Sequence, residues 1–241
     1  MELKGKIAVI TGTRGLGAAI AEAYARAGAT VVCASRTPPA ADHDAPSGVQ
    51  YDRVDVTDLE SVTALMERVS ARYGRLDVVV ANAGVSRDAT LARISPEAWA
   101  ETVGTNVTGT LYTMQAAVRT MRALGNGGRI ITLSSSMATR PVRGAGPYSA
   151  SKAAIEALTR TAAIEFGAHG VTVACLSPGV LDVGLGADLQ AADVWQTYRA
   201  RIALGRPGTG EEIARVAVML AMPESAYVNG SVVEVNGGMS W

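Results

Sequence analysis

The stretch KIAVITGTRGLG, residues 6–17, decides the fold of this chain of 241 residues. A β-branched apolar run ends at Thr11, three glycines follow within six residues, and a helical pattern then begins. Glycines allow a tight turn there and let backbone N–H groups and a helix N-terminus approach a pyrophosphate. The strand–turn–helix context therefore predicts a dinucleotide-binding loop. Its residues are Gly12, Thr13, Arg14, Gly15, Leu16 and Gly17.

Short apolar runs alternate with helical patterns along the rest of the chain. Most runs are continuously apolar, which is typical of strands covered on both faces in a parallel sheet. The alternation predicts an α/β, doubly wound fold with a seven-stranded parallel sheet and helices on both faces. The expected strands are residues 6–11, 30–34, 49–54, 76–81, 129–133, 171–176 and 232–235. The expected helices are residues 18–27, 59–73, 96–124, 149–168 and 211–222.

One connection differs from the others. Residues 36–48 contain three prolines and little helical pattern, so a loop or short turn is expected between the second and third strands. No repeat or low-complexity linker interrupts the chain. A single domain covering residues 1–241 is therefore expected.

The composition argues against several classes of function. The 22 basic and 22 acidic residues cancel without a basic stripe, which argues against nucleic-acid and anionic-membrane partners. No apolar run has the length of a transmembrane helix, and no signal-peptide pattern is seen, so a cytoplasmic protein is expected. Cys33 and Cys175 lie in apolar runs typical of buried thiols. Neither a disulfide nor a metal site is expected.

Lys152 is the single lysine beyond residue 6, and every other basic residue there is an arginine. It follows Tyr148 by four residues, so the two side chains share a face if the segment is helical. A position that keeps the compact ammonium of lysine among many arginines indicates that a planar fork would not serve. A cation beside a phenol lowers the pKa of the tyrosine, as a general acid or base requires. A chance pair on a solvated face is the alternative.

The end of the second expected strand bears on the choice of cofactor. Ser35-Arg36 lacks the acidic residue that would hold the ribose of NAD. Arg14 and Arg36 are expected to converge on a 2′-phosphate instead, which favours NADPH/NADP+ over NADH/NAD+. Asp55-Val56 follows the third strand, where the carboxylate would either reach the adenine amino group or cap the next helix.

Together these elements resemble the short-chain dehydrogenase/reductase family over residues 4–239. Residues 87–93 and 227–239 are similar to its 3-oxoacyl-[acyl-carrier-protein] reductase branch. Each motif is loose alone, but the order and spacing are specific. The matching pieces are the loop of residues 11–17, Asp55-Val56-Thr57-Asp58, Asn82-Ala83-Gly84, Asn106, Ser135, Tyr148 with Lys152, and Pro178-Gly179.

The resemblance implies a Rossmann fold and four catalytic residues. Ser135 would hydrogen-bond the substrate carbonyl, and Tyr148 would donate the proton. Lys152 would lower the pKa of that tyrosine and hold the nicotinamide ribose. Asn106 would fix a water in a proton relay, with hydrogen bonding inside its own helix as the alternative. The implied cofactor-binding set is Gly12, Thr13, Arg14, Gly15, Leu16, Gly17, Ser35, Arg36, Asp55, Val56, Asn82, Ala83, Gly84, Tyr148, Lys152, Pro178, Gly179 and Leu181.

Two positions depart from the family pattern. Gly12 and Gly15 enclose two residues, where the family loop has three. Val183 stands five residues after Pro178, where the family commonly has a threonine that contacts the nicotinamide carboxamide. Both departures are expected to affect how the cofactor is held, because each removes an anchoring group.

Residues 183–206 occupy the place of the family's substrate lid. Packing of lid helices onto the core would explain its apolar residues as well as a substrate lining would. These residues are Leu185, Leu189, Val194, Trp195, Tyr198, Ile202 and Leu204. With no carboxylate clamp identified in the lid, an apolar or acyl-chain ketone is favoured over a small hydroxy acid.

The principal hypothesis is therefore an NADPH-dependent carbonyl reductase that converts a ketone to a secondary alcohol. A 3-oxoacyl thioester, free or on a carrier protein, and a polyketide-like ketone are the substrates considered. The alternatives are an NAD-dependent dehydrogenase of alcohols or cyclic diols and a catalytically silent dinucleotide-binding protein. The four intact catalytic positions argue against the silent protein.

The helices expected over residues 96–124 and 149–168 carry more apolar residues than one sheet-facing stripe needs. They are Met114, Ala117, Val118 and Met121 in the first and Ala154, Leu158 and Ala162 in the second. A second apolar face needs a partner, and family members commonly pair through these helices and through the C-terminal strand. A homotetramer with two-fold axes is expected, with a dimer as the alternative.

Overall fold

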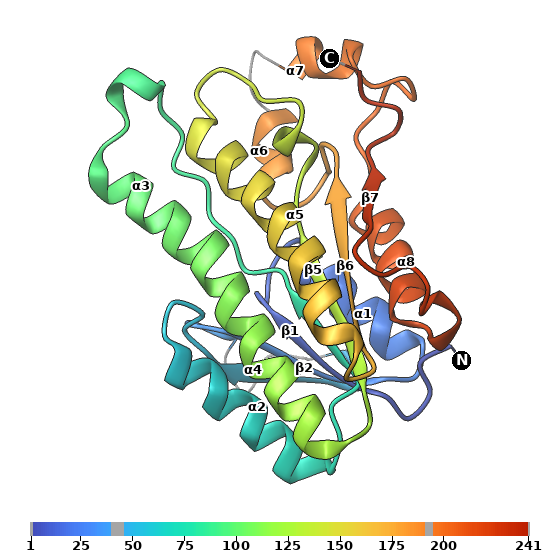
Figure 1. Ribbon diagram of the computed structural model, residues 1–241. Helices are drawn as coiled ribbons and strands as arrows, with labels where there is room; N and C mark the ends of the chain where they lie inside the picture. Colours follow the sequence, from blue (N-terminus) through green and yellow to red (C-terminus); the bar gives the residue numbers. More distant parts are fainter. Residues whose placement is uncertain (1, 40–45, 191–194, 241) are drawn as a thin grey trace.

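The computed structural model describes residues 2–39, 46–190 and 195–240, which form one seven-stranded parallel sheet covered by helices (Figure 1). The strand order is β3-β2-β1-β4-β5-β6-β7, and every pairing is parallel. The predicted doubly wound α/β fold is confirmed. The strands are β1 (Ile7–Thr11), β2 (Thr30–Ser35), β3 (Val49–Arg53), β4 (Val78–Ala81), β5 (Gly128–Leu133), β6 (Val171–Pro178) and β7 (Val232–Val235).

Helices cover both faces of the sheet, and each face has its own apolar core. Alternate side chains of a strand point to opposite faces, so Ile10 lies in one core and Val9 in the other. The first core is closed by α1 and α8, and the second by α2, α4 and α5. The longer helices are α1 (Leu16–Arg26), α2 (Leu59–Tyr73), α3 (Pro96–Val103), α4 (Gly109–Leu124), α5 (Gly146–Gly167) and α8 (Gly210–Ala221).

Capping residues fix where two of these helices begin. The side chain of Asp58 accepts a hydrogen bond from the Glu60 N–H at the start of α2. At the start of α8, Thr209 and Glu212 form a capping box in which each side chain accepts a backbone N–H of the other residue. Because helices here follow strands, these caps hold two loops at the carboxyl edge of the sheet.

The sheet also determines where a ligand can bind. From β1 the chain winds outward to β2 and β3 on one side, and β4 to β7 lie on the other. In such open α/β sheets the crevice lies outside the carboxyl ends of the strands, where the winding direction changes. Figure 1 shows the short helices α6 (Leu185–Gln190) and α7 (Trp195–Ala200) above this edge, beyond the end of β6.

The structure differs from the expected helices in three places. A π-helical turn, Gly104–Thr108, separates α3 from α4 within the single helix expected over residues 96–124. Helix α5 begins at Gly146, so Tyr148 lies inside its first turn. The bounds of the six-residue lid helices α6 and α7 were not predicted, because so few residues show no clear period. In the 36–48 connection the described residues form no helix, and residues 40–45 lie outside the described part.

The expectation that α4 has a second apolar face in need of a partner chain is wrong. Met114, Ala117, Val118 and Met121 are all buried within the monomer. Helix α4 packs against α2 as well as the sheet, so both of its apolar stripes are covered inside one chain. On α5 the side chain that does stand out is Ile164, which is 83% exposed.

No helix in the described residues has both the length and the hydropathy of a membrane span.

Candidate active site

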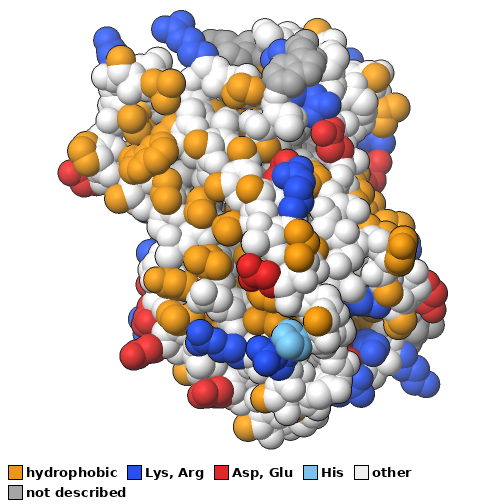
Figure 2. Space-filling view, in the orientation of Figure 1, with side chains coloured by type: hydrophobic (Ala, Val, Ile, Leu, Met, Phe, Trp, Pro, Cys, Tyr) orange, Lys and Arg blue, Asp and Glu red, His pale blue; other side chains and the backbone are white. Residues whose placement is uncertain are grey.

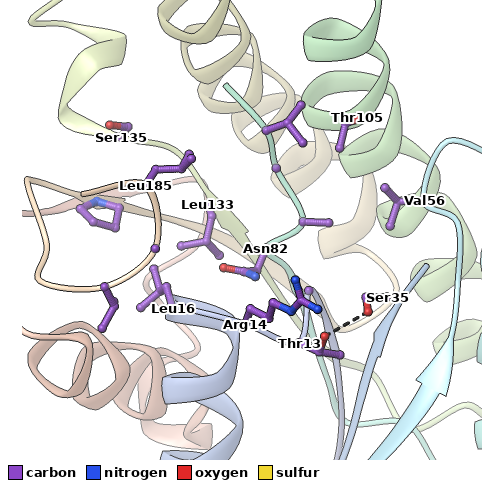
Figure 3. Close-up of a pocket in the computed structure, with 18 of the residues that line it drawn as sticks. Thr13, Arg14, Leu16, Ser35, Val56, Asn82, Thr105, Leu133, Ser135 and Leu185 are labelled. Atoms are coloured by element: carbon purple, nitrogen blue, oxygen red, sulfur yellow. Dashed lines mark hydrogen bonds between the residues drawn. The ribbon is translucent and has the colours of Figure 1, made fainter. Parts of the chain in front are cut away.

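A cleft of about 800 Å³ runs along the carboxyl ends of the strands (Figure 3). It gathers residues from loops that are far apart in the sequence. The predicted site residues that line it are Gly12, Thr13, Arg14, Gly15, Leu16, Ser35, Arg36, Val56, Asn82, Ala83, Gly84, Ser135, Tyr148, Lys152, Pro178, Gly179 and Leu181. Three others, Gly17, Asp55 and Asn106, do not line the cleft.

The glycine loop presents backbone to the cleft because side chains cannot fit there. Gly12 has φ 95°, and a Cβ on it would lie 2.6 Å from the Asn82 Nδ2. A Cβ on Gly17 would collide with the Gly12 carbonyl oxygen. Gly17 does not line the cleft, but its lack of a side chain allows this packing behind the loop. The Thr11 Oγ1 accepts the N–H groups of Asn82 and Ala83, both at 3.1 Å, which joins the ends of β1 and β4.

The charged side chains that line the described cleft are all cationic: Arg14, Arg36 and Lys152. Within the described residues, neither Arg14 nor Arg36 forms an ion pair with a carboxylate. Beside Arg14, the hydroxyls of Thr13 and Ser35 hydrogen-bond each other at 3.0 Å (Figure 3). This end of the cleft is therefore suited to an anionic, hydroxyl-bearing ligand.

Asp55 is engaged in the turn before α2. Its Oδ1 accepts the Thr57 hydroxyl at 2.7 Å and the Thr57 N–H at 3.0 Å. These hydrogen bonds lower the pKa of the Asp55 carboxyl, and the charge of Arg36 contributes to the same shift. These contacts support a local role for Asp55 in the turn before α2. The N-cap of α2 itself is Asp58.

The two departures from the family pattern meet in the structure. A Cβ on Gly15 would lie 3.1 Å from the Gly184 Cα, so the glycine loop and the segment after β6 approach backbone to backbone. Val183 lines the cleft, and a Cβ on Gly210 would lie 3.2 Å from its Cγ2. The Asp182 Oδ1 accepts the Gly210 N–H at 3.1 Å, which ties this segment to the start of α8.

Ser135, Tyr148 and Lys152 come together at the far end of the cleft. The Ser135 Oγ accepts the Met137 N–H at 3.2 Å in the turn that follows β5. Burial raises the pKa of Tyr148 to about 12, and a hydrogen bond with Ser135 opposes this rise. The Lys152 Nζ lies 5.3 Å from the centroid of the tyrosine ring, so the two side chains share a face of α5 as expected. The expected lowering of the Tyr148 pKa by Lys152 is not seen, because burial raises that pKa and Lys152 is not among the groups that shift it.

Lys152 is a buried cation. Its side chain crosses to β5, where the Nζ donates to the Leu133 carbonyl oxygen at 2.7 Å, and the residue is only 4% exposed. Burial lowers the pKa of Lys152 to about 8, because the charged form loses its hydration.

Asn106 is fully buried in the π-helical turn and does not point into the cleft. Its Oδ1 accepts the Val85 N–H at 2.8 Å, and its Nδ2 donates to the Val85 carbonyl and the Ser151 hydroxyl, both at 2.9 Å. The amide therefore joins the loop after β4 to α5. Both of its N–H donors are used within the protein, and the water relay stays a prediction.

Sequence reasoning missed several cleft residues. Thr105 and Leu133 line the cleft, but nothing in a continuous helical or apolar pattern distinguishes them from core positions. The lid residues divide between the two alternatives. Leu185 lines the cleft, whereas Tyr198 and Ile202 are buried in an apolar cluster with Met239. Trp195 packs partly against that cluster, Leu204 is exposed, and Val194 and the side chain of Leu189 lie outside the described part.

The burial of Lys152 predicts a pH-dependent stability difference between the wild type and a Lys152→Met variant. Below about pH 8 the folded and unfolded chains both carry the proton, so the cost of burying the charge is fully present. Between about pH 8 and the ordinary lysine pKa of 10.5, only the unfolded chain keeps it, and folding gains roughly 3 kcal/mol. Urea unfolding should show the wild type gaining that much on the variant as the pH rises through this window. A constant difference would contradict the buried ammonium.

Comparison with known proteins agrees with this fold. The family model described as enoyl-(acyl carrier protein) reductase matches residues 10–240. The chain is 37% identical to the 3-oxoacyl-[acyl-carrier-protein] reductase of Pseudomonas aeruginosa, over 99% of both chains. It is 38% identical to the cis-4-hydroxycyclohexanecarboxylate dehydrogenase of Sinomonas cyclohexanicum, over 97% of this chain and 96% of that one.

A solved structure extends the likeness to three dimensions. A mutant short-chain dehydrogenase/reductase of Serratia marcescens superposes with a TM-score of 0.89 and 30% identity, over 99% of both chains. The predicted resemblance is therefore confirmed: this chain belongs to the short-chain dehydrogenase/reductase family of NAD(P)-dependent oxidoreductases.

Proposed function

We propose that the protein is an NADPH-dependent carbonyl reductase that converts an apolar ketone to a secondary alcohol. One observation carries the proposal: a single cleft lined by Arg14 and Arg36 at one end and by Ser135, Tyr148 and Lys152 at the other. The first pair suits a phosphate-bearing cofactor, and the second group suits proton transfer to a carbonyl oxygen.

The cleft has the features that a dinucleotide needs. Gly12, Gly15 and Gly17 leave a backbone surface at the N-terminus of α1, where N–H groups and the helix dipole favour a pyrophosphate. The guanidinium groups of Arg14 and Arg36, which form no ion pair with a carboxylate among the described residues, would hold a 2′-phosphate in this proposal. Arg36 is also the residue that stands where an NAD-binding chain would place a carboxylate.

Reduction of a carbonyl would involve the side chains at the end of the cleft that holds Ser135, Tyr148 and Lys152. A bound nicotinamide cofactor would supply the hydride. The Ser135 hydroxyl would donate a hydrogen bond to the substrate oxygen and stabilise its developing negative charge. Tyr148 would transfer its proton to that oxygen, with the ammonium of Lys152 favouring the phenolate that remains. Asn106 would hold the loop after β4 and α5 in register, and a water relay beside it is part of the proposal.

An apolar ketone is the substrate class that the lid supports. Leu185 lines the cleft, and Tyr198 and Ile202 of the lid segment pack with Met239 in an apolar cluster. The similarity to a 3-oxoacyl-[acyl-carrier-protein] reductase favours a 3-oxoacyl thioester, free or on a carrier protein. Polyketide-like ketones share the same chemistry and belong to the same test.

A second candidate is an NAD-dependent dehydrogenase of alcohols or cyclic diols. A relative named as a cis-4-hydroxycyclohexanecarboxylate dehydrogenase is as similar to this chain as the reductase is. The same Ser135 and Tyr148 would then act in reverse, with the phenolate accepting the hydroxyl proton of the substrate.

The experiment that tests the proposal is a substrate panel assayed by nicotinamide absorbance. Acetoacetyl-CoA, a carrier-protein-bound 3-oxoacyl chain and simple apolar ketones are each offered with NADPH and with NADH. Cyclohexanols are offered with NADP+ and NAD+. We expect ketone reduction with NADPH to be fastest. Faster alcohol oxidation with NAD+ would favour the second candidate, and a silent panel would contradict both.

We expect Tyr148→Phe to lower kcat by about 10²–10⁴-fold, because it removes the proton donor and leaves the ring in place. Cofactor affinity, measured by fluorescence titration, should change little. Turnover near that of the wild type would remove Tyr148 from the mechanism.

We expect Arg36→Asp to weaken NADPH binding much more than NADH binding, since it removes a phosphate partner and adds repulsion. Arg93→Asp, a change of the same charge on an exposed residue that does not line the cleft, should leave the NADPH/NADH ratio unchanged. Titration of both cofactors with both variants measures the effect. An unchanged ratio in Arg36→Asp would contradict the assignment of this residue to the 2′-phosphate.

We also propose a homotetramer. The support comes from α5 and β7, because the apolar residues named on α4 are buried within one chain. Ile164 on α5 is 83% exposed, and β7 leaves a sheet edge open beside the fully exposed Tyr227. Figure 2 shows further apolar side chains scattered over α4 and α5 on the same face.

Ile164→Glu should lower the mass measured by light scattering, because it places a carboxylate in the proposed contact between α5 helices. Ala71→Glu adds the same charge to an exposed position of α2 and should leave the mass unchanged. A wild type that scatters as a monomer, or a variant that keeps the tetramer, would contradict the α5 contact.

A further inference from the structure

The face of α5 that carries Tyr148 and Lys152 continues into a buried carboxylate. Glu156 follows Lys152 by four residues, as Lys152 follows Tyr148, so the three side chains share one stripe of the helix. Glu156 is only 8% exposed. A buried carboxylate is costly unless it is paired and hydrogen-bonded, so its contacts indicate what it does there.

The Glu156 carboxylate bridges α5 to the strand that leads to Ser135. Its Oε1 accepts the Ser134 hydroxyl at 2.9 Å, and the same hydroxyl approaches the Lys152 carbonyl oxygen at 3.2 Å. The Oε2 lies 3.4 Å from Arg160, whose side chain is more than half exposed. The buried end of the carboxylate is therefore committed to Ser134, and the other end reaches toward solvent.

Ser134 and Ser135 are adjacent residues that follow β5, and both line the cleft. The Ser134 hydroxyl is engaged with Glu156 and the Lys152 carbonyl of α5. The Ser135 side chain instead faces Tyr148 and bonds to it. Figure 3 shows Ser135 at the cleft. Because neighbouring side chains of an extended segment are fixed relative to each other, a hydrogen bond that fixes Ser134 also limits where Ser135 can lie. The partner of Ser135 is Tyr148, two turns before Glu156 on the same helix.

We propose that Glu156 is a positioning residue that sets the geometry between Ser135 and Tyr148 through its hydrogen bond to Ser134. The proposal rests on the proposed function in one respect, that these two hydroxyls act on the substrate oxygen. Small displacements of reacting groups are expensive in rate, so the effect should appear in kcat and not in cofactor affinity.

The same two elements offer a matched control. One turn further along α5, the Thr159 hydroxyl hydrogen-bonds the Thr132 hydroxyl of β5 at 2.7 Å. This bond also joins β5 to α5 and is also buried, but it lies farther from Ser135 along the strand. Thr159→Val removes it and should lower Tm while leaving kcat within about twofold.

The test compares Glu156→Leu, Glu156→Gln, Ser134→Ala and the Ser134→Ala/Glu156→Leu double variant. Glu156→Leu and Ser134→Ala should each lower kcat about tenfold or more, with unchanged cofactor dissociation constants. Glu156→Gln keeps an acceptor for Ser134 and should restore kcat to within about threefold of the wild type. The double variant should be no slower than either single variant, because both remove one interaction.

Hydrogen exchange supplies a readout that needs no substrate. The N–H groups of Met137 and Ala138 donate to the Oγ and the carbonyl oxygen of Ser135, so their exchange reports on this turn. Peptides that cover residues 133–140 should exchange faster in Glu156→Leu and Ser134→Ala than in the wild type. Exchange there should be unchanged in Glu156→Gln and Thr159→Val.

The outcomes separate the two claims. If the wild type turns over nothing in the substrate panel, the proposed function fails, and exchange in residues 133–140 still decides the role of Glu156. The positioning role is overturned if Glu156→Leu keeps both kcat and exchange, if Glu156→Gln is as slow as Glu156→Leu, or if Thr159→Val lowers kcat equally. If Glu156→Leu does not fold, Ser134→Ala and Glu156→Gln give the same decision.

Discussion

The site depends on holding one ammonium group out of water. The Lys152 Nζ has the Leu133 carbonyl oxygen as its partner, and a Cβ on Gly84 would lie only 3.7 Å away. The ammonium of lysine is a compact point charge, which suits this enclosed position beside a single carbonyl acceptor. The cost of that burial is what the surrounding hydrogen bonds have to offset.

In the protein without a ligand, burial disfavours the charged forms of both titrating groups at the site. Burial raises the pKa of Tyr148 to about 12 and lowers that of Lys152 to about 8. A polyanionic ligand would reverse this balance and favour the ammonium. Ligand binding and the protonation of Lys152 are therefore coupled by electrostatics.

Much of the fold followed from the sequence, because periodicity and glycine placement act locally. Helix α2 was predicted residue for residue, and its ends are set by Asp58 and Gly74, side chains that the local sequence displays. Most of the predicted site residues line the cleft, since family motifs indicate which loops meet. Gly17, Asp55 and Asn106 do not, and the contacts of Asp55 in its own turn could be weighed only once they were seen.

What the sequence did not reveal depends on packing between distant elements. The burial of Met114 and Met121 requires that α2 lies over α4, and no pattern within α4 shows this. The π-helical turn around Asn106 and the acceptor role of Glu156 likewise arise from contacts across the fold. An acidic residue in a helix is most often solvated, so the sequence alone gives no reason to expect a buried Glu156.

The two departures from the family pattern form one structural change. In the shorter glycine loop Gly15 lies against Gly184, where a Cβ on Gly15 would be only 3.1 Å from the Gly184 Cα. Val183, the other departure, immediately precedes Gly184 and packs its methyl groups at Gly210, where α8 begins. An apolar residue suits that position better than a hydroxyl, which would need a partner among apolar neighbours. The shorter loop and the valine therefore lie at adjoining positions, one against Gly184 and the other against the start of α8.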